Sequence, residues 1–312
     1  MFKSINILYR QIIFAVLAIL CFTPFIDPPL ALLLGFIVAQ TIGNPFKQLN
    51  SKATQLLLKV CVVGLGFGMN LQQAMQAGKE GFVFTIFTIV LTLVSGFLIG
   101  KWLSVDKKTS FLISSGTSIC GGSAIAAVSP IVEADERQIS VALGAVFVLN
   151  SVALMLFPYL GNLFNMSQHD FGLWSAIAIH DTSSVVGASS KFGQEALQVA
   201  TTVKLERALW IIPLSIISAI IYKRKGKAIK IPYFIGLFII TMCISTYLPE
   251  YKYIYDGAVV VSKKGLCLTL FLIGTGLSLN NLKAVGARPF IQAVALWVII
   301  SSVSLAVILL IK

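Results

Sequence analysis

Charged residues are scarce in this chain. They make up 12% of its 312 residues, about half the share of roughly 25% that soluble proteins carry. Residues of the set AVILMFWYC make up 57%, and so few charges cannot supply the polar surface that a soluble chain of this length needs around its core. The composition therefore excludes a soluble globular enzyme and a disordered scaffold, and it predicts an all-α polytopic membrane protein.

Several catalytic motifs are also missing. The sequence contains no G-x-x-x-x-G-K-[ST] for nucleotide phosphates, no H-E-x-x-H for zinc and no G-x-S-x-G for a nucleophilic serine. It has two histidines, His169 and His180, and five cysteines without C-x-x-C spacing. Cysteines in apolar stretches behave as small hydrophobic residues. We therefore expect no enzyme activity, no cofactor and no metal site.

Eleven apolar segments follow one another along the chain. They lie at residues 11–24, 30–42, 56–69, 82–103, 111–132, 141–160, 171–190, 208–222, 232–248, 257–279 and 290–311. A membrane-spanning helix needs about 20 residues, so the shorter segments must borrow polar flanks or be broken. The polar stretches between them have the length of turns, which predicts a single transmembrane domain over residues 1–312. We expect repeat-like halves at about 29–165 and 166–312, with 1–28 as an extra N-terminal helix.

Basic residues outnumber acidic ones by 24 to 12, and they lie in short clusters between the apolar segments. Loops at 47–52, 101–108, 223–230 and 283–288 are basic, whereas loops near 27, 133–136 and 250–256 are acidic or neutral. Cytoplasmic loops of membrane proteins carry the excess of Lys and Arg. The pattern predicts a bacterial inner-membrane protein with a cytoplasmic N-terminus and an external C-terminus, and it argues against nucleic acid as a partner.

An internal repeat joins two of the segments. Residues 63–70, VGLGFGMN, match residues 273–280, IGTGLSLN, and each copy ends in an asparagine, Asn70 and Asn280. In the orientation above the two copies run in opposite directions, which is typical of the inverted repeats of secondary transporters. The alternative is that these glycines only allow helices to pack closely.

A second pair of similar stretches interrupts apolar sequence with Gly, Ser and Thr. Residues 117–124, TSICGGSA, resemble residues 182–189, TSSVVGAS. Such breaks at membrane depth are tolerated where the backbone is buried or lines a watery cavity. Segments 111–132 and 171–190 either cross the membrane fully or are re-entrant from opposite faces. We favour broken or re-entrant elements whose tips meet, because only these restore the inverted order of the two halves.

The candidate site lies at these breaks. His180 and Asp181 form an ionisable pair within an apolar stretch, which favours coupling to an ion, although Asp181 alone also suits a helix cap. Small residues with free N–H and hydroxyl groups favour binding of an oxyanion at helix ends. We expect the substrate to be bound by Ser118, Gly121, Gly122, Ser123, Thr182, Ser183, Asn70 and Asn280.

Three polar positions outside this set need an interpretation. Arg207 suits an anionic substrate, but with Glu206 we interpret it as a surface ion pair ahead of the apolar helix at 208–222. Lys204 precedes the same helix. Asn150, within an apolar stretch, is expected to form a hydrogen bond across helices, with contact to the substrate left open.

The stretches Gly116–Ala127 and His180–Gly187, together with the two glycine repeats, resemble the YeiH-like family, whose members are named as sulfate exporters while their activities are largely unassigned. The similarity runs from about Pro29 to Ile311. It implies kinship with bile acid symporters and sodium–proton antiporters, inverted repeats, and a core domain in which interrupted helices meet at the substrate. Ala124 stands where the symporter relatives have the last glycine of G-G-x-G.

The residues and the resemblance together predict a secondary active transporter for a small anion, sulfate-like or sulfonate-like, coupled to H⁺ or Na⁺ by alternating access. The expected partners are that anion, the coupling ion and the lipid bilayer. The oligomeric state stays open, a homodimer included. A passive anion channel and an intramembrane enzyme that acts on lipid are the alternatives.

Overall fold

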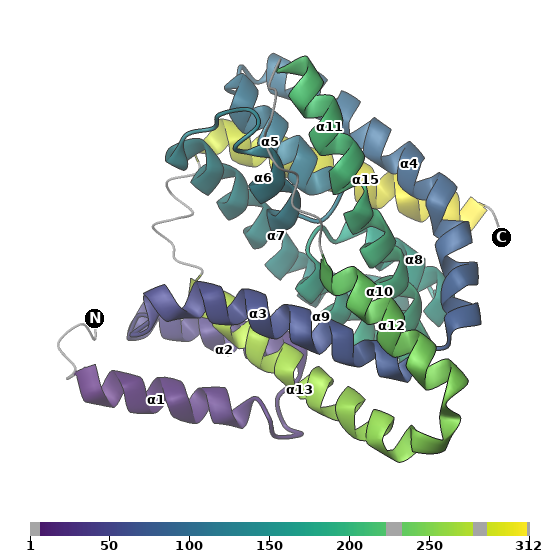
Figure 1. Cartoon of the computed structure of the whole chain (residues 1–312). Helices are drawn as coiled ribbons and strands as arrows, with labels where there is room; N and C mark the ends of the chain where they lie inside the picture. The colour runs from purple at the N-terminus through teal and green to yellow at the C-terminus, as the bar shows by residue number, and fades with distance from the viewer. Residues whose placement is uncertain (1–6, 223–232, 277–285, 311–312) are drawn as a thin grey trace. The chain divides into compact units, whose positions relative to one another are not determined.

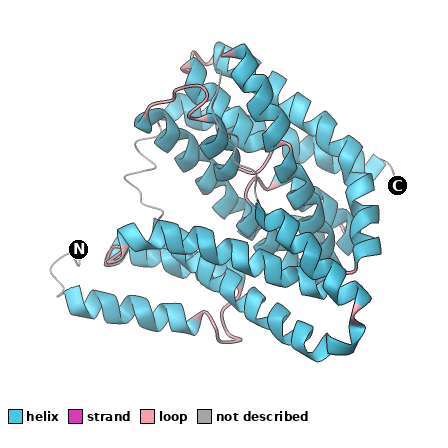
Figure 2. Cartoon of the chain, in the orientation of Figure 1, coloured by secondary structure: helices cyan, strands magenta, loops and turns pink. Residues whose placement is uncertain are grey.

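The computed structural model describes residues 7–222, 233–276 and 286–310. Within these ranges the chain is helical, with turns between the helices and no strand (Figure 2). The chain therefore has the all-α architecture that the composition predicts. Asn280 lies outside the described residues, so the structure does not bear on its predicted role.

The helices form two compact units that are interleaved in sequence. The first unit comprises Met1–Met75 and Tyr233–Leu279, and the second comprises Gln76–Pro232 and Asn280–Lys312. Each unit takes segments from both of the repeat-like halves predicted at 29–165 and 166–312. The predicted boundary near residue 165 therefore does not separate the units.

The first unit packs its helices through glycine. It contains α1 (Ile7–Leu20), α2 (Pro28–Thr41), α3 (Lys47–Leu65), the 3₁₀ turn η1 (Gly66–Gly68), α12 (Tyr233–Tyr247), the 3₁₀ turn η2 (Pro249–Tyr251) and α13 (Lys252–Gly276) (Figure 1). A Cβ atom on Gly35 of α2 would collide with the carbonyl oxygen of Phe271, and one on Gly274 of α13 would collide with that of Leu32. The backbones of α2 and α13 are therefore in direct contact.

The first glycine repeat and the described part of the second, residues 273–276, lie at the ends of antiparallel helices. Gly64 near the end of α3 faces Ser262 of α13, and one turn earlier Cys61 faces Gly265. The contact partner on α13 has a higher residue number when the residue on α3 has a lower one. The two helices therefore run in opposite directions, as predicted for the copies. Gly64 and Gly274 also allow close packing of the helices, and whether packing is their only role stays open.

The second unit contains two interrupted helices. It contains most of α4 (Leu71–Trp102), then α5 (Lys107–Ser118), α6 (Gly122–Val128), α7 (Glu136–Leu163), α8 (Gln168–Ala178), α9 (Thr182–Phe192), α10 (Gln194–Leu209), α11 (Ile211–Ile221) and α15 (Ala287–Leu310). The apolar segment at 111–132 forms the pair α5 and α6, and the segment at 171–190 forms α8 and α9. Helix α10 falls between the predicted segments and was missed by them.

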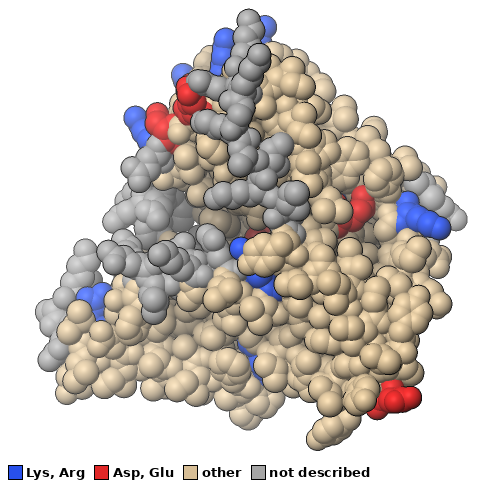
Figure 3. Space-filling view, in the orientation of Figure 1, with Lys and Arg blue, Asp and Glu red and all other residues tan. Residues whose placement is uncertain are grey.

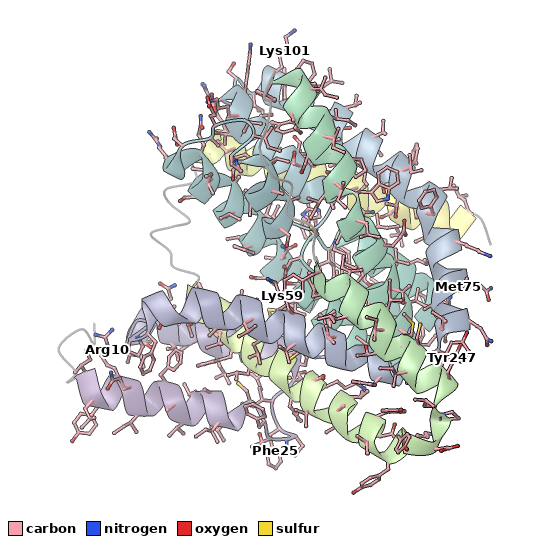
Figure 4. The ribbon with its side chains drawn as sticks, in the orientation of Figure 1. Arg10, Phe25, Lys59, Met75, Lys101 and Tyr247 are labelled. Carbon is pink, nitrogen blue, oxygen red and sulfur yellow. The ribbon has the colours of Figure 1, made fainter. Side chains whose placement is uncertain are left out.

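Four helices are long and apolar enough to cross a membrane in the part of the chain described: Ala74–Trp102, Arg137–Leu163, Pro249–Gly276 and Ala287–Leu310. Four shorter apolar helices accompany them. Charged side chains are few on the face drawn in Figure 3, and Lys101, labelled in Figure 4, is exposed at the end of α4. The chain is thus a polytopic membrane protein.

Helix α4 shows how the membrane setting reverses the usual pattern. Its threonines Thr85, Thr88 and Thr92 follow one another at helical spacing and are at most 2% exposed. Large apolar side chains cover the opposite face and are about half exposed or more, namely Val83, Phe87, Val90, Val94 and Phe97. A soluble helix would bury the apolar face, whereas this one turns its hydroxyl groups inward, and that of Thr88 accepts a hydrogen bond from Arg207.

Candidate functional site

The first interrupted helix, α5 and α6, folds back on itself. Lys108 at the start of α5 donates to the carbonyl oxygen of Glu133, beyond the end of α6, at 2.7 Å. The amide of Gln138 donates to the carboxylate of Asp106, which caps α5, at 2.8 Å. A continuous helix would separate residues 25 positions apart by about 38 Å. The segment is therefore a re-entrant hairpin, with both of its ends on the same side.

The carboxylate of Asp106 fixes this end of the first hairpin. Partial burial opposes its ionisation, but hydrogen bonds from the backbone N–H and hydroxyl of Thr109, the N–H of Lys108 and the amide of Gln138 outweigh that effect and lower the pKa of Asp106. These donors favour the charged form of the carboxylate. Asp106 thus joins the start of α5 to the start of α7.

The second interrupted helix, α8 and α9, is also a hairpin. The rings of Phe171, near the start of α8, and Phe192, at the end of α9, stack with centroids 3.9 Å apart. Gln168 accepts a hydrogen bond from the backbone N–H of Glu195 at 3.0 Å. Residues at the two ends of the segment therefore lie side by side. The favoured re-entrant interpretation of residues 171–190 is confirmed.

The two hairpins open toward opposite ends of α7. The first hairpin is tied to the start of α7 through Gln138, whereas the second begins at Gln168, a few residues after α7 ends at Leu163. With 28 residues, α7 is about 42 Å long, and it contains one of the four membrane-spanning candidates. The open ends of the two hairpins therefore lie at opposite ends of a helix that is long enough to cross a membrane.

The tips of the hairpins meet. Gly121, at the turn of the first hairpin, has φ +60° and ψ −120°, a conformation that glycine adopts without steric cost. A Cβ atom there would lie 3.3 Å from the carbonyl oxygen of His180, at the turn of the second hairpin. The structure thus brings together two breaks whose contacting residues, Gly121 and His180, are 59 positions apart in the sequence. The aligned stretches 117–124 and 182–189 are not equivalent, because the first spans its break and the second follows it.

Lys204 of α10 binds both tips. Its ammonium donates to the carbonyl oxygens of Ile119 at 3.0 Å, Ala176 at 3.1 Å and Ile179 at 2.7 Å. These carbonyls belong to the ends of α5 and α8, where a helix leaves its last C=O groups unpaired and carries a partial negative charge. Lys204 is fully buried, and it stabilises both helix ends at once.

Arg207, one helical turn further along α10, binds the first tip. Its guanidinium donates to the carbonyl oxygen of Ser118 and to the hydroxyl of Thr88 on α4, the latter at 3.0 Å. Arg207 is fully buried too, so the expectation of a surface pair with Glu206 was wrong. Neither Lys204 nor Arg207 has a carboxylate within salt-bridge distance among the described residues; the carboxylates that act on them electrostatically are Asp181 for Lys204 and Glu206 for Arg207.

Asp181 caps α9. Its carboxylate accepts hydrogen bonds from the hydroxyl of Ser183 and from the backbone N–H of Ser184, the latter at 3.2 Å. The capping role that the sequence offered as an alternative is therefore present. The hydroxyl of Ser183 and the first N–H groups of α9 turn toward this carboxylate, so an anion at this helix start must share those groups with Asp181.

Several buried polar atoms near the tips lack a partner within the described part of the chain. They are the hydroxyls of Ser115 and Thr117, the amide nitrogen of Asn150, both ring nitrogens of His180 and Nε of Arg207. Buried polar groups are normally hydrogen-bonded, so an unpaired set calls for a ligand or water. Positive charge and unused donors thus occur together at the meeting point of the hairpins.

The predicted site residues divide into three groups. Ser118, Gly121, Gly122, Thr182 and Ser183 lie at or beside the tips, with His180 and Asp181. Ser123 is exposed on α6. Asn70 belongs to the first unit, where its side-chain oxygen accepts from the N–H of Gln72 at 2.9 Å.

Asn150 forms the expected bond across elements. Its side-chain oxygen on α7 accepts from the backbone N–H of His180 at 3.0 Å. The sequence interpretation missed the central role of Lys204 and Arg207 because α10 is polar and lacks an apolar period. Their i, i+3 spacing was the available signal, since it places two cations on one helix face.

The comparisons with known proteins agree on one family. The family model described as conserved hypothetical protein 698 matches residues 8–293. A UPF0324 membrane protein of Bacteroides thetaiotaomicron is 48% identical, with 97% of each chain covered. One of Shewanella oneidensis is 50% identical over 96% of this chain and 95% of its own, and UPF0324 membrane protein Bd1437 of Bdellovibrio bacteriovorus is 46% identical over 96% and 94%. No solved structure gives a significant match.

Proposed function

The chain belongs to the family of UPF0324 membrane proteins, which is also the YeiH-like family that its sequence resembles, and we propose that it is a secondary active transporter for a small anion. The substrate class is an oxyanion such as sulfate or a sulfonate. Transport proceeds by alternating access and is coupled to H⁺ or Na⁺. The protein lies in the bacterial inner membrane with its N-terminus in the cytoplasm and its C-terminus outside.

The two buried cations at the hairpin tips carry this proposal. Charged side chains within a membrane are costly, and they mark the paths of substrates and ions. Lys204 and Arg207 are both fully buried, and neither has a carboxylate within salt-bridge distance among the described residues. A bound anion would supply the missing negative charge and accept hydrogen bonds from the unused donors of Asn150 and Thr117.

The hairpins suit alternating access. In the proposed cycle each hairpin opens toward a different face of the membrane, and the two tips meet at the substrate. Movement of one group of helices against another then exposes the substrate to one side or the other. Ser118, Gly121 and Gly122 approach from the first hairpin, and Thr182 and Ser183 approach from the second. His180 and Asp181 lie between them, in the position proposed for the coupling ion.

Coupled uptake by proteoliposomes tests the proposal. Asp181→Asn keeps the cap, because Asn and Asp cap helices equally well, but it removes the charge. We expect this variant to lose uptake of labelled sulfate or methanesulfonate driven by an imposed pH or Na⁺ gradient. Asp135→Asn is the matched control, since Asp135 caps α7 away from the tips, and it should transport like the original protein. If the Asp181→Asn variant takes up the anion as fast as the original protein under the same gradient, Asp181 has no role in coupling.

A further inference from the structure

Three backbone carbonyl oxygens converge on the ammonium of Lys204. Three carbonyl oxygens, of Ile119, Ala176 and Ile179, lie between 2.7 and 3.1 Å from the lysine nitrogen. They come from two different hairpins, so their convergence depends on the tertiary fold and not on one local turn. The side chain that reaches them is completely buried.

Carbonyl groups of this kind bind alkali ions in other settings. Unwound backbone and the C-terminal ends of half-helices coordinate Na⁺ in secondary transporters, and rings of carbonyl oxygens replace the hydration shell of K⁺ in channels. Here the same type of oxygen faces a primary ammonium group. An ammonium carries the same charge as an alkali ion and offers three donors for three acceptors.

The backbone at the second tip leaves the carbonyl oxygen of Ala176 available to Lys204. In a continuous helix the carbonyl of Ala176 would accept from the N–H of His180, four residues later. That N–H instead donates to the side-chain oxygen of Asn150. Where the helical bond is interrupted, Asn150 therefore accepts from the N–H of His180, and Lys204 donates to the carbonyl oxygen of Ala176.

We propose that the ammonium of Lys204 is a tethered cation in a carbonyl site that otherwise suits Na⁺ or K⁺. The wild-type protein holds no free alkali ion at this place, because the lysine fills it. Removal of the ammonium without a replacement side chain opens the site to alkali ions. The consequence for transport rests on the proposed function: a Na⁺-coupled cycle would have to use another place, such as His180 and Asp181.

Thermal unfolding of the purified protein in detergent tests the site without any transport assay. Lys204→Ala leaves the three carbonyls and creates space, whereas Lys204→Met leaves the carbonyls but fills that space with an apolar side chain. Each is heated in NaCl, KCl and choline chloride at equal ionic strength. We expect Tm of Lys204→Ala to rise in NaCl or KCl over choline by roughly 2–4 °C at a tenfold excess over Kd. The original protein and Lys204→Met should show no such difference.

Lys108→Ala is the matched control. Lys108 also donates to a loop carbonyl, that of Glu133, but this oxygen is a single acceptor at the open end of the first hairpin. Its removal should leave unfolding insensitive to the choice of cation. A folded Lys204→Ala protein that unfolds at the same Tm in all three salts would overturn the proposal, as would an equal alkali effect in the original protein.

Recovery of folded protein gives a second measurement if Lys204→Ala does not survive purification in choline. The variant is then solubilised in NaCl, KCl or methylammonium chloride, and the monodisperse fraction is measured. Recovery with these small cations but not with choline supports a cation site, and failure with all of them contradicts it. Because no anion substrate or gradient is present, either result leaves the anion-transport proposal to its own test.

Discussion

The backbone of Gly121 packs against the carbonyl group of His180, so that a Cβ atom at position 121 would lie 3.3 Å from that oxygen. This is the point at which the two hairpins touch. Gly121 is also the only glycine of the hairpin tips with a positive φ, at +60°, within the described ranges. The contact therefore depends on the absence of a side chain at one position.

Gly121→Ala should destabilise the protein. The substitution forces an L-residue into a strained backbone conformation, which costs on the order of 1–3 kcal/mol, and it pushes the tips apart. We expect a lower Tm in detergent. Gly236→Ala is the control, because a Cβ there meets no atom within 4 Å and alanine in a helix gains up to about 1 kcal/mol over glycine. Equal effects of the two substitutions would argue against the contact between the tips.

Asn150→Leu should destabilise the second tip. It leaves the buried N–H of His180 without its acceptor, and an unsatisfied buried donor costs about 1–3 kcal/mol. Ser151→Ala is the neighbouring control, since the hydroxyl of Ser151 donates to the carbonyl of Phe147 in its own helix. Thermal unfolding and hydrogen exchange at residues 176–184 measure the effect. Unchanged exchange at His180 in Asn150→Leu would show that its N–H has another partner.

Thr88→Val tests the support of Arg207 from α4. The substitution keeps the shape of the side chain and removes the hydroxyl that accepts from the guanidinium at 3.0 Å. A hydrogen bond to a charged group contributes about 1.5–3 kcal/mol, so Tm should fall. Thr92→Val, one turn later, removes a hydroxyl that bonds only to the carbonyl of Thr88 and should have a smaller effect. A larger fall in Tm for Thr92→Val than for Thr88→Val would show that the hydroxyl of Thr88 does not stabilise Arg207.

Asp106 should make stability depend on pH at the acidic end. The pKa of Asp106 is lowered in the folded protein, so its carboxylate stabilises the fold at pH values above the unfolded pKa of about 3.9. This contribution is lost as pH falls through the lower folded pKa. Asp106→Asn caps α5 without ionising, so its Tm should lie below that of the original protein at pH 6. The difference should shrink toward pH 3, and a constant difference would contradict the lowered pKa.

The sequence predicted the helices of this protein better than its site. Apolar runs located the spanning helices, and the glycine and serine interruptions located both hairpins, because these residues disfavour a continuous helix within an apolar run. Helix α10 was missed because Lys204 and Arg207 lie among its buried apolar residues, so that it shows no apolar periodicity. Their roles were missed with it, although Lys204 binds both tips and Arg207 binds the first.

The contact between the two hairpin tips also could not be predicted from the sequence. The similarity of residues 117–124 to residues 182–189 suggested a register that the structure does not use. Gly121 and His180 meet because α7 and α10 place the hairpins, and these tertiary contacts leave no local pattern. Asn150 was the exception, since a lone amide within an apolar stretch indicates a hydrogen bond across helices.

Counterflow is the most direct test of anion transport by this protein. Proteoliposomes are preloaded with unlabelled sulfate or a sulfonate and diluted into a trace of the labelled anion, without any ion gradient. A transporter with one shared site predicts transient accumulation of label above equilibrium, at a rate that saturates with external anion. Flux that rises linearly without overshoot would indicate a channel. The absence of exchange for every oxyanion tested, in protein that is folded and monodisperse, would contradict anion transport.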